Sequence, residues 1–193
     1  MSRISELSRT SKETDISLRL DLDGTGKANI DTGIGFFDHM LTALAFHGRF
    51  DLDVKAKGDL FVDMHHTVED VGILMGKAFA AAAEGIPVKR YGTAFVPMDE
   101  ALARTVLDVS GRSFLVYDGC GLHQKNFPGF DGILVTEFLR AFAFNAGITL
   151  HVKIEYGDNA HHMAEACFKS LGQALRQGYT RADEVMSTKG ILD

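Results

Sequence analysis

With 193 residues, the chain is long enough for one domain of ordinary size or for two small halves packed together. Its hydrophobic share of 46% and charged share of 24% are typical of a folded globular protein, and a formal net charge of −6 argues against a general nucleic-acid or anionic-membrane binder. No apolar run is long enough to cross a bilayer, the first fifteen residues contain no apolar signal core, and the two cysteines form no CxxC pair, so we expect a cytoplasmic protein.

The first half of the chain shows strand and helix patterns in turn. Residues 15–22 alternate between polar and apolar and predict a half-buried strand, after which a glycine-rich turn leads into a short partner strand. Apolar residues at helical spacing predict a helix over residues 37–48, and alternation over 50–57 predicts another strand. A second helix is expected to start near His65 and to end at Pro87.

The second half repeats this order of patterns. We expect three strands, a helix, a strand and a final helix, around residues 93–97, 101–109, 112–118, 131–145, 148–154 and from 161 onward. Each half therefore contains a sheet and two helices. The predicted fold class is α+β.

Two local matches indicate an internal duplication. HHTVED (65–70) recurs as HHMAEA (161–166), and residues 32–59 align with residues 131–158 without a gap. Glycines, an apolar helix, an alternating strand and an HHxxE motif follow in the same order in both copies. We therefore predict two repeat halves, residues 1–93 and 94–193, that pack rigidly as one compact unit.

The adjacent histidines are the clearest chemical signal. Asp63 and Asn159 each lie two residues before a His pair and are candidate helix N-caps, which places both pairs in the first turn of a helix. In each motif the Glu follows the two histidines by four and three residues, spacings that bring side chains together on a helix surface. Adjacent helical residues point about 100° apart, so one motif can serve two metals, or one metal and a substrate. Imidazoles with a carboxylate suit manganese, iron, zinc or nickel.

Four further histidines receive different interpretations. His39 lies on an otherwise apolar helix and His151 on the outer face of a core strand, and both are candidate ligands. We expect a structural role for His47 and assign no role to His123. These residues alone leave two alternatives open: a non-enzymatic His-rich metal sensor or store, and a dinuclear metallohydrolase that activates water.

Short blocks spread over residues 11–190 resemble, in order, the signature blocks of the imidazoleglycerol-phosphate dehydratase family. They are SKETDI (11–16), FFDHML (36–41), HGRFDLDV (47–54), HHTVEDVGI (65–73), RYG (90–92), PMDEAL (97–102), DVSGR (108–112), TLHV (149–152), HHMAEACFK (161–169) and STKG (187–190). Ser113 and Met186 replace frequent prolines of the family, and residues 122–131 match poorly. The phosphatase domain fused to the enzyme in some bacteria is absent, so the resemblance implies the monofunctional form.

The resemblance implies a duplicated half of the ribosomal protein S5 domain 2-like type, with helices packed between two four-stranded sheets. It implies a hydro-lyase of histidine biosynthesis, which converts D-erythro-imidazole glycerol phosphate to imidazole acetol phosphate and water. It also implies a homo-oligomer, a shell of 24 chains built from trimers, with sites at subunit interfaces. Two Mn²⁺ ions per active site would be held by His39, His65, His66, Glu69, His151, His161, His162 and Glu165.

The resemblance also suggests roles around the metals. Glu13 is the candidate for acid/base work and substrate binding, and the ligands Glu69 and Glu165 are counted with it as catalytic. The candidates for phosphate capture are Arg90, Arg112, Ser187 and Lys189, because Arg offers a planar fork and Lys a point charge to phosphate oxygens. Asp99 and Glu100 are candidates for orienting histidines. Which histidine binds which ion, and which chain supplies each residue, stay open.

Overall fold

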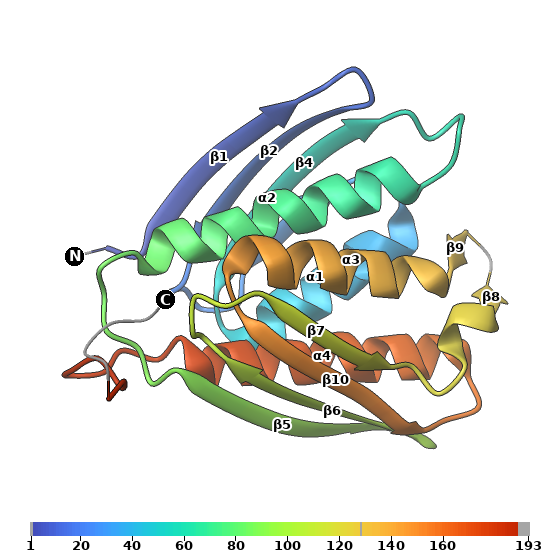
Figure 1. Ribbon diagram of the computed structural model, residues 1–193. Helices are drawn as coiled ribbons and strands as arrows, with labels where there is room; N and C mark the ends of the chain where they lie inside the picture. The colour runs from blue at the N-terminus through green and yellow to red at the C-terminus, as the bar shows by residue number, and fades with distance from the viewer. Residues whose placement is uncertain (1, 128, 189–193) are drawn as a thin grey trace.

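Two four-stranded sheets enclose four helices (Figure 1). The computed structural model describes residues 2–127 and 129–188. One sheet is formed by strands within residues 4–58, and the other by strands within residues 91–156. The α+β class and the position of the helices between the sheets are therefore as predicted, and the repetition fits the expected duplication. The division at residues 93 and 94 stays a prediction.

The first sheet has the strand order β1-β2-β4-β3. Its strands are β1 (Ile4–Thr10), β2 (Thr14–Asp21), β3 (Ala28–Asp31) and β4 (Asp51–Gly58). Strand β1 was not predicted. The short strand after the glycine-rich turn does exist, but it pairs in parallel with β4 and not with β2 as expected. The chain passes through a helix between β3 and β4, which is the connection that parallel neighbours require.

The second sheet repeats this arrangement in the order β5-β6-β10-β7. Its strands are β5 (Tyr91–Met98), β6 (Ala101–Asp108), β7 (Phe114–Asp118) and β10 (Thr149–Tyr156). The poorly matching stretch contains a 3-10 turn, η1 (Leu122–Gln124), and a small hairpin, β8 (Asn126–Phe127) and β9 (Phe130–Asp131). Leu150 and Val152 are buried while His151 between them is exposed, as the alternation predicted.

Each helix packs against a helix of the other half. The helices are α1 (Gly35–Gly48), α2 (His65–Ala83), α3 (Ile133–Ala146) and α4 (Ala160–Gly178). Helix α2 contacts α3, and α1 contacts α4. Both contacts pass over a glycine: a Cβ at Gly76 would lie 2.6 Å from the carbonyl oxygen of Phe142, and one at Gly172 would lie 2.5 Å from that of Leu44. The two halves therefore share one core instead of meeting at a surface.

The predicted apolar stripe of α2 is buried in this core, although the helix ends at Ala83, before Pro87. Aromatic rings fill the space between the helix layers, with Phe79 against Phe142 and Phe138 against Phe168. Among the described residues, none of the helices has the length and apolar character needed to cross a membrane.

Candidate metal centre and substrate-binding residues

The two His pairs begin helices α2 and α4, whose N-termini lie at the same end of the molecule (Figure 1). Asn159 is the N-cap of α4, as predicted, and its side chain accepts a hydrogen bond from the backbone N–H of His161 at 2.9 Å. Asp63 accepts the equivalent bond from His65 at 2.8 Å, but the cap residue of α2 is Met64. The prediction of Asp63 as the N-cap of α2 is thus wrong by one position, although Asp63 does accept the capping hydrogen bond from His65.

The first group of candidate ligands joins α1 and α4. Nitrogen atoms of His39 and His161 and a carboxylate oxygen of Glu165 lie within 4.8 Å of one another. Glu165 Oε2 is 3.2 Å from His161 Nε2 and 3.5 Å from His39 Nε2. Burial by itself would raise the pKa of Glu165, but the Lys169 ammonium at 2.7 Å and the nearby His39 lower it. The carboxylate therefore stays ionised and suited to a cation.

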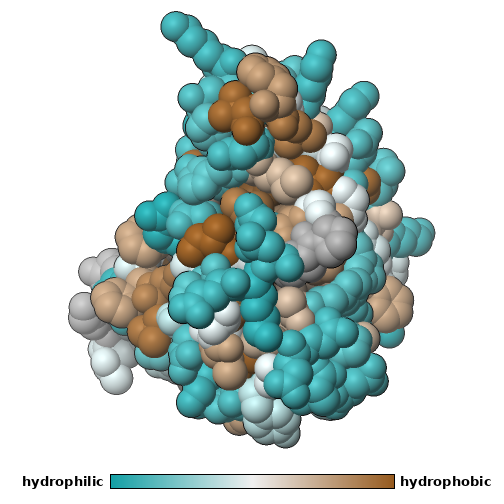
Figure 2. All heavy atoms as spheres, turned by 90° about the vertical axis from the view of Figure 1, so that its right-hand side faces the viewer, coloured by the Kyte–Doolittle hydropathy of each residue, from teal (hydrophilic) through white to brown (hydrophobic). Residues whose placement is uncertain are grey.

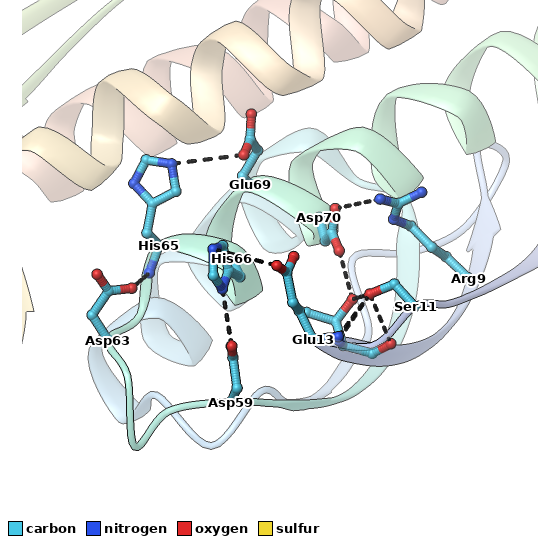
Figure 3. Close-up of polar contacts among 10 residues, drawn as sticks. Arg9, Ser11, Glu13, Asp59, Asp63, His65, His66, Glu69 and Asp70 are labelled. Carbon is cyan, nitrogen blue, oxygen red and sulfur yellow. Dashed lines mark hydrogen bonds and ion pairs between the residues drawn. The ribbon is translucent and has the colours of Figure 1, made fainter.

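The second group joins α2 and α3 and consists of His65, Glu69 and Glu137. His65 Nε2 is 3.6 Å from Glu69 Oε2 (Figure 3). The guanidinium of Arg140 contacts the carboxylates of Glu69 and Glu137. Glu137 was missed by the sequence analysis. The only available signal was its alignment, in the repeat, with Asp38 beside His39.

The second histidine of each pair faces a carboxylate through Nδ1. His66 Nδ1 lies 3.0 Å from Asp59, and His162 Nδ1 lies 2.7 Å from Glu100. The contact with Asp59 raises the pKa of His66, and the contact with His162 lowers the pKa of Glu100 to about 2. The expected orienting role of Glu100 agrees with this geometry, and Asp59 is a second such residue that the sequence did not reveal.

Glu13 reaches the first-half motif from the turn between β1 and β2 (Figure 3). Its carboxylate is 3.9 Å from His66 Nε2, and its backbone N–H donates to the Ser11 hydroxyl at 3.1 Å. In the second half, Asp99 lies 3.7 Å from His162 Nε2. Each of these rings thus has one carboxylate on either side.

His151 belongs to neither group. It lies exposed on the outer face of the second sheet, on β10. The chain therefore brings together, within its own fold, seven of the eight candidate ligands as two His–carboxylate groups and two carboxylate-oriented histidines. The ligand assignments stay predictions.

The candidate phosphate residues gather elsewhere, around Asp108 at the end of β6. Arg90 donates to both oxygens of this carboxylate, at 2.6 and 3.0 Å, and to the carbonyl oxygen of Met186 at 2.7 Å. The bond to Asp108 raises the pKa of Arg90. Arg112 lies 3.8 Å from the same carboxylate, and Ser187 follows Met186 in the chain. Lys189 lies outside the described residues.

This arginine cluster, formed by Arg90 and Arg112, lies at the opposite end of α4 from the histidines. The backbone N–H of Arg90 donates to the carbonyl of Gly178, the last residue of α4, while His161 is in its first turn. At 1.5 Å per residue the two positions are about 26 Å apart. Within one copy, the histidines and the arginine cluster are therefore well separated.

The face at the helix N-termini is mixed in character. Figure 2 shows hydrophilic side chains over much of this end of the molecule, with hydrophobic side chains gathered between them. The loop that precedes His65 exposes Leu60, Phe61 and Val62, and the Phe61 side chain is 91% exposed. An apolar loop beside the candidate ligands is suited to contact with another protein surface.

Comparison with known proteins places these residues in context. The family model described as imidazoleglycerol-phosphate dehydratase matches residues 32–175. A relative of that name from Acetivibrio thermocellus is 57% identical over the whole of both chains, and one from Clostridium novyi is 56% identical over 95% of each. A Staphylococcus aureus crystal structure of that name has a TM-score of 0.83 at 37% identity, over 93% of this chain and 99% of its own. A structure of the Pyrococcus furiosus protein has a TM-score of 0.82 at 38% sequence identity, and the match covers 96% of this chain and 100% of the other.

Proposed function

The chain belongs to the imidazoleglycerol-phosphate dehydratase family, and on this premise we propose that it removes water from D-erythro-imidazole glycerol phosphate at a dinuclear manganese site. The product is imidazole acetol phosphate, and the reaction is the hydro-lyase step that the family contributes to histidine biosynthesis. The observation that carries the proposal is the pair of His–carboxylate groups at the N-termini of α2 and α4. A protein of this kind is expected in the cytoplasm.

The donor atoms in the chain fit such ions. Imidazole nitrogens and carboxylate oxygens suit a borderline divalent metal, and neither group found among the described residues contains a cysteine. The residues that would hold the ions are His39, His65, His66, Glu69, His151, His161, His162 and Glu165. When bound, the two cations would supply the positive charge that favours loss of the N–H proton from the substrate's imidazole.

The chain's own carboxylates would move the other protons. The electron-rich imidazole can expel hydroxide from the adjoining carbon, after which the next C–H is acidic enough for a carboxylate to remove. The hydroxide takes up one proton and leaves as water, the ring nitrogen regains the other, and the resulting enol becomes the ketone. Glu13 is our candidate for this proton transfer because it lies beside His66, on an exposed turn.

The separation within one chain supports a site built from more than one copy. The substrate is far shorter than the rise of about 26 Å from His161 to Gly178, the residue that Arg90 contacts, so an arginine cluster from another copy would have to meet the histidines. The exposed apolar loop of residues 60–62 lies at this end. His151 lies on a sheet face that also exposes Tyr91, Phe95 and Phe114, another surface suited to self-association. We propose a homo-oligomer, with 24 chains as the size that the family resemblance suggests.

A dehydratase assay on chelator-stripped protein tests the function. Activity on imidazole glycerol phosphate should be absent after stripping and should return with Mn²⁺. His161→Ala should abolish it, while His123→Ala, a change at an exposed histidine of η1, should leave it near the wild-type level. A stripped protein that binds Mn²⁺ but shows no dehydration would refute the assigned reaction and favour the hydrolase or sensor. Light scattering of the same sample measures the oligomer size.

A further inference from the structure

Two carboxylates, Asp59 and Glu100, hold the second histidine of each motif by the same ring atom. Asp59 lies 3.0 and 3.2 Å from His66 Nδ1 through its two oxygens, and Glu100 lies 2.7 Å from His162 Nδ1. A carboxylate that faces Nδ1 favours the neutral imidazole tautomer in which the ring proton is on Nδ1. The lone pair is then on Nε2, the nitrogen that would bind a metal and that faces Glu13 in His66 and Asp99 in His162.

Both residues are held in place by backbone hydrogen bonds, Asp59 through its main chain and Glu100 through its carboxylate. The N–H of Asp59 donates to the carbonyl of Glu13 at 3.0 Å, and its own carbonyl accepts from Val62 at 2.8 Å. Glu100 Oε1 accepts from the backbone N–H groups of Asp158 and Asn159, at 3.2 and 2.7 Å, while Oε2 faces the ring. The His162 ring is therefore oriented by a carboxylate that the backbone holds, and the His66 ring by a side chain whose own main chain is hydrogen-bonded on both sides.

The two contacts do not come from matching positions of the repeat. Asp59 follows β4 and aligns with Asp158, yet Asp158 contributes only its backbone N–H to Glu100. Glu100 instead comes from the turn between β5 and β6. The same geometry is reached from two different places in the fold, so simple copying of one half does not account for it.

From this geometry we propose that Asp59 and Glu100 are positioning residues that hold Nε2 of His66 and His162 ready for the metal ions. The inference rests on the proposed manganese centre and deepens it. Carboxylate partners of metal-bound histidines typically raise metal affinity by about 10- to 100-fold. Loss of either contact should weaken Mn²⁺ binding by that order while the number of ions bound at saturation stays the same.

The test is Mn²⁺ titration of the full-length, chelator-stripped protein in competition with a chelator. Asp59→Ala and Glu100→Ala should bind about 10- to 100-fold more weakly than wild type. Asp59→Asn and Glu100→Gln retain an acceptor oxygen and should recover part of the affinity. Asp53→Asn, which removes one charge from the outer face of the first sheet, is the matched control and should bind as wild type does.

Thermal unfolding of the metal-free variants separates positioning from folding. For a positioning role, the Asn and Gln variants should unfold near the wild-type temperature while their Mn²⁺ affinity falls. If all four variants bind Mn²⁺ like Asp53→Asn, or if affinity falls only in step with metal-free stability, the positioning role is refuted and the proposed function stands. If wild type itself binds no Mn²⁺, the proposed function fails and the positioning role fails with it.

Discussion

Replacement of Gly76 by Ala should separate α2 from α3. The added Cβ would lie 2.6 Å from the Phe142 carbonyl oxygen and 2.8 Å from the Ala146 nitrogen, and these backbone atoms cannot move without the helix. Overpacking of this kind costs about 1–3 kcal/mol, and contact with backbone favours the upper end. The higher helix propensity of Ala relative to Gly offsets about 1 kcal/mol of this cost. The net loss is therefore about 2 kcal/mol, or about 4–8 °C in Tm for a chain of this size.

Thermal unfolding by circular dichroism at one fixed protein concentration measures this loss, because assembly makes Tm depend on concentration. Gly35→Ala is the matched control: this glycine begins α1, and a Cβ there meets nothing within 4 Å. Gly172→Ala should behave like Gly76→Ala, since its Cβ would meet the Leu44 carbonyl at 2.5 Å. Equal unfolding temperatures for the Gly76 and Gly35 variants would refute the close-contact reasoning.

Substitutions at three more residues test polar contacts. Asp70 is buried, pairs with Arg9 at 2.9 Å and accepts from Thr14, so Asp70→Ala should cost about 3 kcal/mol in urea unfolding, and Asp70→Asn clearly less. The hydrogen bond from Arg3 lowers the pKa of Asp23 to about 2. The stability that this ion pair contributes is therefore present above the usual carboxyl pKa of about 4 and is lost as the pH falls toward 2. Asp23→Asn should therefore be less stable than wild type at pH 6, and the difference in unfolding free energy should narrow with acid; a constant difference would contradict this. Asn159→Ala should cost about 1 kcal/mol in the metal-free protein, through loss of the α4 cap, and an unchanged urea midpoint would argue against that cap.

Local patterns were sufficient for most of the fold. Alternation and helical spacing identified the four helices and six of the strands, because each has an apolar face that the shared core buries. Strand β1 was not predicted because its sequence, ISELSRT, contains only Ile4 and Leu7 as apolar residues. Its strand conformation depends on pairing with β2 along its whole length. The pairing of β3 with β4 is equally non-local, since it depends on how α1 crosses the sheet.

The candidate site shows the same division between local and distant information. The HHxxE spacing was enough to bring His65 to Glu69 and His161 to Glu165. The partners Glu137 and Asp59 come from other elements, and a single sequence does not reveal which distant carboxylate a fold brings near a histidine. The separation of the arginine cluster from the histidines was also hidden, because it follows from the direction of α4 between them.

That separation has a genetic consequence if copies of the chain complete one another's sites. A variant with a defective His161 end still carries an intact arginine cluster, and a variant that lacks Arg90 still carries intact histidines. Co-assembly of the two variants would create some sites that combine intact histidines from one chain with an intact arginine cluster from the other. Two inactive alleles of this type should therefore complement each other in one cell, whereas two alleles damaged at the same end should not.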